Sequence, residues 1–154
     1  MSTMVIVLMT SVILQPVAVQ TAQGPPGRKG KAPESASLTA IKNAVEARFR
    51  KLEANSTVRL RYVSVAPRPK RGAVLEVGLT PPTDQKFEFH AETAYMLIWQ
   101  ALMKEKNAFK ELGRVQVSLN RSGRQMLIDC PIESVEDSVG YTDFARLKRL
   151  CKVS

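Results

Sequence analysis

The chain has 154 residues, of which 44% are hydrophobic and 24% are charged. This composition excludes a wholly disordered protein and fits one compact domain behind a targeting segment. With 23 basic and 14 acidic side chains, the formal net charge is +9. A basic balance of this size suits polyanionic partners, such as nucleic acid, acidic lipid headgroups or an acidic protein, and is also compatible with an ordinary soluble surface.

The N-terminal segment is mostly apolar, and the first charged side chain is that of Arg28. Residues 4–19 read MVIVLMTSVILQPVAV, which suits the apolar centre of an export signal. We therefore expect residues 1–22 to be a signal peptide or a membrane anchor. The domain behind them is expected to be extracytoplasmic, either secreted or membrane-anchored.

The sidedness of this segment stays open, because its features conflict. Cleavage after Ala22 would put Gln20 where a signal peptide needs a small side chain. An uncleaved anchor would be short for a membrane span, and the positive charges of Arg28, Lys29 and Lys31 would hold the domain on the cytoplasmic side. A buried apolar element of the fold is the third alternative.

Residues 23–36 are rich in proline, glycine and lysine and show no apolar period. This predicts a flexible basic linker, and residues 37–154 are then expected to form a single α+β domain. Its first helix begins with Ser37 as the N-cap. The apolar side chains of this helix recur at helical spacing, namely Leu38, Ile41, Ala44, Val45, Phe49 and Leu52.

Three short strands are expected next. Apolar and polar side chains alternate over residues 57–66 and 73–79, which predicts two half-buried strands joined by the turn 67–72. Residues 86–90 read KFEFH and predict a third strand with both phenylalanines facing the core.

A second long helix is expected over residues 91–112, where apolar side chains again recur at helical spacing and Gly113 stands at a C-cap position. Two more strands follow, at 115–119 and 125–130, and an amphipathic helix begins near Thr142. The expected order is α-β-β-β-α-β-β-α. It predicts a two-layer α+β sandwich, with an antiparallel sheet of about five strands and helices packed on one face.

Five basic side chains gather in the first predicted hairpin. Two lie on its polar face and three in its turn, so that together they could grip phosphates as one cationic strip; these are Arg59, Arg61, Arg68, Lys70 and Arg71. The alternative interpretation is a solvated turn that keeps the sheet edge soluble.

Cys130 and Cys151 are the only cysteines, and an even number behind an export signal permits one disulfide. Two buried free thiols are the alternative. His90 is the only histidine, and one histidine with two distant cysteines makes no metal-binding pattern, so no metal is expected. His90 and Asp129 could act as a catalytic pair only if the fold brings them together. No cofactor or small-molecule ligand is indicated.

These observations favour a non-enzymatic binding or assembly module, exported or membrane-tethered, with a protein partner in an envelope or secretory complex. The basic linker could also contact an acidic membrane surface, the alternative being a solvated tether. The alternative function is nucleic-acid binding through the 59–71 hairpin, with an affinity that weakens steeply as salt rises.

Overall fold

The computed structural model describes residues 35–68, 70–136 and 143–154. The predicted segment 1–22 and all but the last two residues of the predicted linker 23–36 lie outside this range, as does Thr142. The elements run α1 (Ala36–Ala54), β1 (Arg59–Ala66), β2 (Ala73–Thr80), α2 (Phe87–Leu102), α3 (Ala108–Glu111), β3 (Leu112–Arg121), β4 (Arg124–Pro131), α4 (Ile132–Glu136), α5 (Phe144–Leu150) and β5 (Lys152–Val153).

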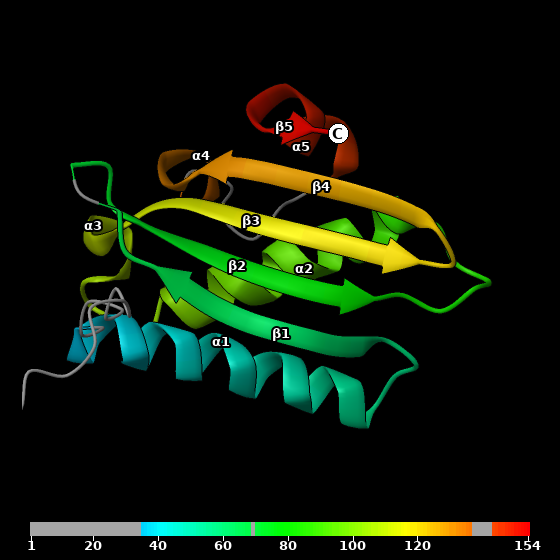
Figure 1. The fold of residues 1–154 in the computed structure, drawn as a ribbon, viewed down its shortest axis with the longest axis horizontal. Helices are drawn as coiled ribbons and strands as arrows, with labels where there is room; N and C mark the ends of the chain where they lie inside the picture. Colours follow the sequence, from blue (N-terminus) through cyan, green and yellow to red (C-terminus); the bar gives the residue numbers. More distant parts are fainter. Residues whose placement is uncertain (1–34, 69, 137–142) are drawn as a thin grey trace, which may run out of the picture. The chain divides into compact units, whose positions relative to one another are not determined.

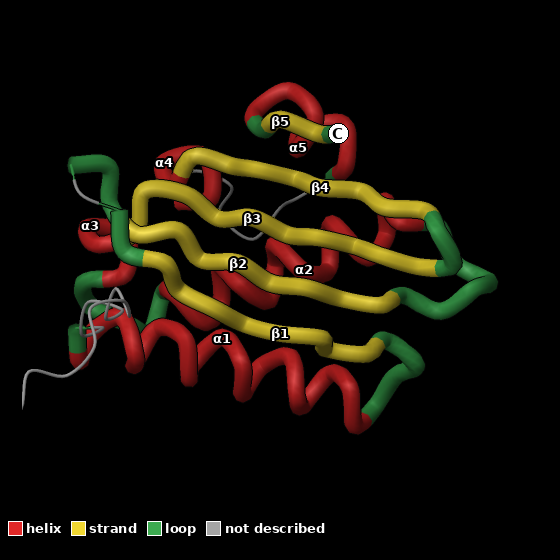
Figure 2. The backbone as a smooth tube through the Cα atoms, in the orientation of Figure 1, coloured by secondary structure: helices red, strands yellow, loops and turns green. Residues whose placement is uncertain are grey.

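The five strands form one sheet in the order β1-β2-β3-β4-β5 (Figure 1). β1 pairs antiparallel with β2, and β4 pairs antiparallel with both β3 and β5. β2 and β3 pair in parallel, so the chain must cross back over the sheet between them, and it does so through α2 (Figure 2). The predicted α+β sandwich is confirmed, with a mixed sheet in place of a purely antiparallel one.

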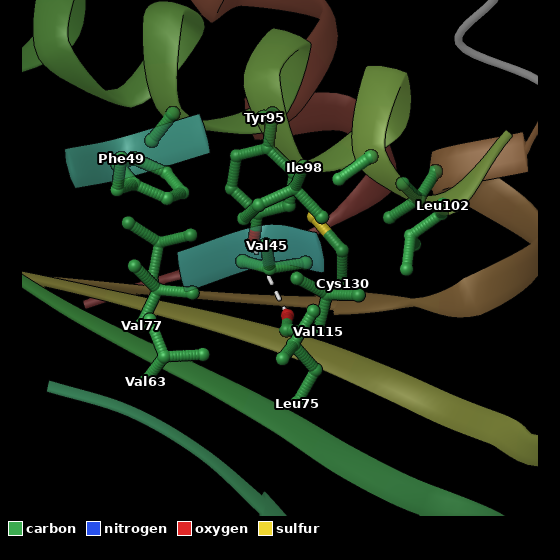
Figure 3. Packing of buried hydrophobic residues seen from close by; sticks show 14 of the residues in the cluster. Val45, Phe49, Val63, Leu75, Val77, Tyr95, Ile98, Leu102, Val115 and Cys130 are labelled. Atoms are coloured by element: carbon green, nitrogen blue, oxygen red, sulfur yellow. Dashed lines mark hydrogen bonds between the residues drawn. The ribbon is translucent and has the colours of Figure 1, made fainter. Parts of the chain in front are cut away.

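The core lies between the sheet and α1 with α2. Alternate side chains of the central strands point to this side, among them Leu75 and Val77 of β2 and Val115 and Val117 of β3, each buried completely. They pack against Val45 and Phe49 of α1 and against Tyr95, Ile98 and Leu102 of α2 (Figure 3).

Tyr95 is the largest of the fully buried side chains. Its hydroxyl lies 3.1 Å from the carbonyl oxygens of Val115 and Ile128 and donates its single proton to this pair. Burial raises the pKa of Tyr95 well above its usual value, and the nearby charge of Asp129 adds to the effect. The hydroxyl therefore stays protonated and joins α2 to both β3 and β4.

The predicted strand at residues 86–90 is wrong, because Lys86 is the N-cap of α2 and residues 87–90 form its first turn. Phe87 packs against the core, whereas Phe89 is 55% exposed. A five-residue alternation does not distinguish a strand from a helix turn, and the helical spacing of the buried side chains extends back to His90. No third strand therefore separates β2 from α2, and the fifth strand of the sheet is the C-terminal β5.

The boundaries of the predicted helices also differ. The N-cap of α1 is Ser35 rather than Ser37, and its Oγ accepts from the Leu38 N–H at 3.2 Å. The second helix ends at Leu102 rather than at residue 112, and Gly113 lies inside β3. A Cβ at Gly113 would sit 1.8 Å from the Arg71 carbonyl oxygen, so this glycine permits a close backbone contact and caps no helix.

Cys130 and Cys151 form a disulfide, which confirms the predicted pair. Cys130 belongs to β4, and Cys151 stands between α5 and β5. Two residue pairs join β5 to β4, and Leu127 and Ser154 exchange two further backbone hydrogen bonds, so the covalent link adds to a short stretch of strand pairing at the C-terminal segment.

We predict that Cys151→Ser lowers the free energy of unfolding by about 3 kcal/mol, the chain-entropy value for a loop of this length. Urea titration monitored by circular dichroism measures the change. The wild-type chain in a thiol reductant is the control and should unfold at the same urea concentration as the variant. Equal midpoints for the oxidised and reduced wild type would contradict the prediction.

Candidate functional site

The helix α2 has two different faces. One is buried against the sheet and α1, and it carries His90, Ala91, Ala94, Tyr95, Ile98, Ala101 and Leu102. On the opposite face Phe89 and Met96, and Met103 just beyond the last turn, are 55%, 36% and 58% exposed. They are seven residues apart and so share one side of the helix. We call these three residues the α2 row.

The α2 row is about 21 Å long at the rise of an α-helix. Among the described residues, five large apolar side chains are exposed, and three of the five belong to this row. Exposed apolar side chains scattered singly are normal on a soluble protein, whereas apolar side chains gathered on one surface mark interaction sites. The alignment of these three makes this side of α2 the candidate surface. The sequence carried the signal in its seven-residue spacing, but the mistaken strand at 86–90 hid it.

A hollow of about 400 Å³ lies between the end of α1 and the start of α2. We call it the His90 hollow. Its lining comes from α1, from the loop that leads to β1, from Gln85 and from α2, and consists of Leu52, Ser56, Thr57, Val58, Gln85, Phe89, His90 and Thr93. The first residue of the α2 row, Phe89, thus forms part of its wall.

His90 is only 3% exposed, and its Nε2 atom is buried without a hydrogen-bond partner. Within the described residues this is the one buried side-chain nitrogen or oxygen in that condition. Leaving such an atom unpaired costs about 1–3 kcal/mol. The nearest ring is that of Phe89, edge-on at 5.4 Å between centroids.

Burial lowers the pKa of His90, and the positive charge of Arg121 lowers it further. Asp84 acts in the opposite direction. The imidazole is therefore neutral near pH 7, with one nitrogen that can donate and one that can accept.

A second hollow, of about 390 Å³, shares Gln85 with the first and is lined mostly by polar residues. Arg121 at the end of β3 donates to the carbonyl oxygens of Pro82 and Gln85, the latter at 2.8 Å, and stacks over the Phe87 ring at 4.8 Å. These contacts fasten the loop before α2 to the β3–β4 hairpin. The Arg121 side chain therefore holds the loop before α2 in place at this hollow.

The five predicted phosphate contacts are all exposed. They do not form one strip, because Arg59 and Arg61 lie at the start of β1 and the other three lie in the loop after it. The strand is ~26 Å long at the usual rise per residue. The structure therefore places the cations in two groups near opposite ends of the edge strand, Arg59 with Arg61, and Arg68 with Lys70 and Arg71.

His90 and Asp129 are not brought together. Asp129 lies between the buried Ile128 and Cys130, so its side chain points to the sheet face away from the helices. There its Oδ1 accepts from Nε of Arg114 at 2.7 Å, and this contact raises the pKa of Arg114. The structure gives no support to a catalytic pair of these two residues.

Neither a family model, nor a curated protein, nor a solved structure matches the chain. In the part of the chain that the structure describes, no helix is both long and apolar enough to cross a membrane. Nor do these residues contain a group of three or more His, Cys, Asp and Glu side chains that could hold a metal ion.

The lowered pKa of His90 predicts a loss of stability on acidification. The unfolded chain takes up a proton below about pH 6.5, and the folded chain resists it. The free energy of unfolding should therefore be level well above pH 6.5 and fall as the pH drops through 6.5 toward the lowered pKa of the folded state. Urea midpoints measured at several pH values across this interval test the effect.

The matched variant is His90→Gln, which keeps a polar side chain that does not titrate. In this variant the free energy of unfolding should no longer decrease as the pH drops through 6.5, because His90 is the only histidine of the chain. An unchanged pH dependence in the variant would show that other groups cause it.

Proposed function

We propose that the chain is a non-enzymatic binding or assembly module that is exported or tethered to a membrane. It contacts a protein partner in an envelope or secretory complex. The observation that carries the proposal is the α2 row, because it leaves an aligned apolar surface on a helix whose opposite face already completes the core.

The chemistry of the row suits protein docking. Methionine side chains are unbranched and adapt their shape to a partner, and an exposed phenylalanine can fill a pocket on the other surface. Thr93 and Gln100 lie on the same side of α2 and add polar contacts that need no charge. A seven-residue spacing matches the seam by which one helix packs along another. The proposed partner therefore presents the apolar side of an amphipathic helix to α2.

The compartment is part of the proposal. A disulfide such as Cys130–Cys151 forms and persists in oxidising compartments and is compatible with an extracytoplasmic location. The apolar, charge-free start of the sequence supports the same extracytoplasmic location. Nucleic-acid binding by the exposed cations of the 59–71 hairpin stays the second proposal, and an affinity that is insensitive to salt would exclude it.

A photo-crosslinking side chain at Met96 tests the proposal in the native host. We predict one defined covalent adduct with an envelope protein, because the row holds its partner in direct contact. The matched control places the same side chain at Asn43, which is exposed on the solvent side of α1. Adducts are measured by mass shift after cell fractionation.

The second arm combines the crosslinker at Met96 with Phe89→Glu, a change at an exposed position of the same row. It should reduce the adduct at least tenfold, because a charge would be buried in an apolar contact. Equal adducts from Met96 and Asn43, or the absence of an adduct from Met96, would contradict the proposal.

A further inference from the structure

We propose that a single strand of nucleic acid binds along β1 on the open side of the sheet, where one base stacks on the ring of Tyr62. Its phosphates contact the cations at both ends of β1. This binding mode rests on the second proposed function, nucleic-acid binding by the 59–71 hairpin. It adds the surface, the single-stranded form and the residue that contacts a base.

The described helices leave one side of the sheet open. In Figure 1, α2 lies behind the strands, and no described helix crosses the side that faces the viewer. Side chains on this open side alternate along each strand with those of the core. Across the paired strands they form a mostly polar surface, which includes the partly exposed Ser64, Glu76, Gln116 and Ser118.

Tyr62 lies on the open side. Its partner on β2 is Gly78, which stands between Val77 and Leu79 of the core and therefore faces away from it. A Cβ at Gly78 would meet three atoms of the Tyr62 ring at 2.7 Å or less, so the ring lies against this glycine. Tyr62 is nevertheless 43% exposed. The outward side of the ring is thus free to stack on a base, and such stacking tolerates any base because every base has a π-face.

Two arginines share this side of β1 with Tyr62. The register of the strand shifts between Leu60 and Tyr62, and Arg61 and Tyr62 are exposed in succession between two buried residues. Such a bulge turns both side chains to the open side. Arg59 faces the same way, because it precedes the buried Leu60. Among the described residues neither arginine is in an ion pair, so both are available to phosphates.

The other cations lie at the far end of β1. Arg68, Lys70 and Arg71 are exposed in the loop that follows the strand. Because ~26 Å of strand separates the two groups, no single phosphate contacts both. A strand of about eight nucleotides can contact both, and this length is within the usual site size of about 4–16 nucleotides. Cations at both ends with an exposed ring between them therefore fit a strand better than a compact anion.

Glu76 influences what lies beside the ring. It neighbours Gly78 on the open side of β2, and its Oε2 accepts from the Ser64 hydroxyl at 3.1 Å. This carboxylate repels a phosphate but not an uncharged base. The bases of a duplex are stacked on one another and reach a side chain only by leaving the stack. The surface is therefore expected to take a single strand and to bind a duplex more weakly.

The test uses three fluorescent probes. They are a mixed-sequence DNA strand of about twelve nucleotides, an abasic strand with the same number of phosphates, and the first strand annealed to its complement. Each is titrated into the purified full chain at several salt concentrations, and binding is followed by fluorescence anisotropy. We expect the single strand to bind at least tenfold more tightly than the abasic strand, because only its bases stack on Tyr62. It should also bind more tightly than the duplex, although the duplex carries more phosphates.

Tyr62→Leu and Tyr62→Phe separate stacking from packing. Leucine still covers Gly78 but has no ring, so the affinity for the single strand should fall to that for the abasic strand. The affinity for the abasic strand should not change. Phenylalanine keeps the ring and should bind the single strand as the wild type does. Circular dichroism checks that both variants are folded.

A crosslink tests the same contact without any substitution. The single strand is made with 5-bromouracil, irradiated with the wild-type chain, and the adduct is mapped by mass spectrometry. We expect the adduct on Tyr62. An adduct confined to other residues would contradict the proposed stacking.

The cations are tested through the salt dependence of binding. Arg59→Gln combined with Arg61→Gln should lower the slope of log affinity against log salt by about two for the single and the abasic strand alike. Lys104→Gln, an exposed cation beyond the end of α2, is the control and should leave the slope unchanged. The matching change at the far end of β1 should lower the slope by about three, because one strand reaches both groups. It combines Arg68→Gln, Lys70→Gln and Arg71→Gln.

Failure of this binding mode is distinguishable from failure of the second proposed function. Salt-dependent binding that is equal for the single and the abasic strand, or that Tyr62→Leu leaves unchanged, overturns the binding mode and leaves nucleic-acid binding in place. The absence of binding to all three probes overturns both. Poly-glutamate that competes with the single strand at equal concentrations of charge would assign the surface to an acidic protein, and would also overturn the proposal.

Discussion

Parallel pairing of β2 with β3 is the constraint on which the rest of the structure depends. Two adjacent parallel strands need a connection that crosses the length of the sheet, and α2 makes this crossing. Tyr95 then ties the helix to the carbonyl groups of β3 and β4. One side of α2 is thereby committed to the core, and its opposite side is left to solvent.

The α2 row and the His90 hollow both follow from this placement of α2. Its exposed side carries Phe89, Met96 and Met103, and its first turn meets the end of α1 at the His90 hollow. The loop before the helix is held by Arg121 from the β3–β4 hairpin, which positions His90 and Phe89 without using either side chain. The exposed side chains of Phe89, Met96 and Met103 are therefore carried by a helix whose opposite face makes the contacts that stabilise it.

Much of the fold could be predicted from the sequence, because α1 and the strands β1, β2, β3 and β4 have clear apolar periods. The predictions failed where one local pattern was compatible with two structures. The five residues before Ala91 alternate like a strand but form the start of a helix. Gly113 follows an apolar run, as a C-cap glycine would, but it lies in a strand where the Arg71 backbone comes too close for a Cβ. Three features depend on contacts between distant segments, which no local period encodes. They are the parallel pairing of β2 with β3, the two-residue strand β5 and the unpaired Nε2 atom of His90.

The central claim is that the α2 row serves binding and not folding. The direct test is the triple variant Phe89→Gln, Met96→Gln, Met103→Gln, with the free energy of unfolding measured by urea titration. Surface changes of this kind stay small, so the account predicts a value within about 1 kcal/mol of the wild type. Ile98→Ala on the buried side of the same helix is the reference and should cost about 2–5 kcal/mol. A loss in the triple variant as large as that of Ile98→Ala would show that the row belongs to the core, and would contradict the account.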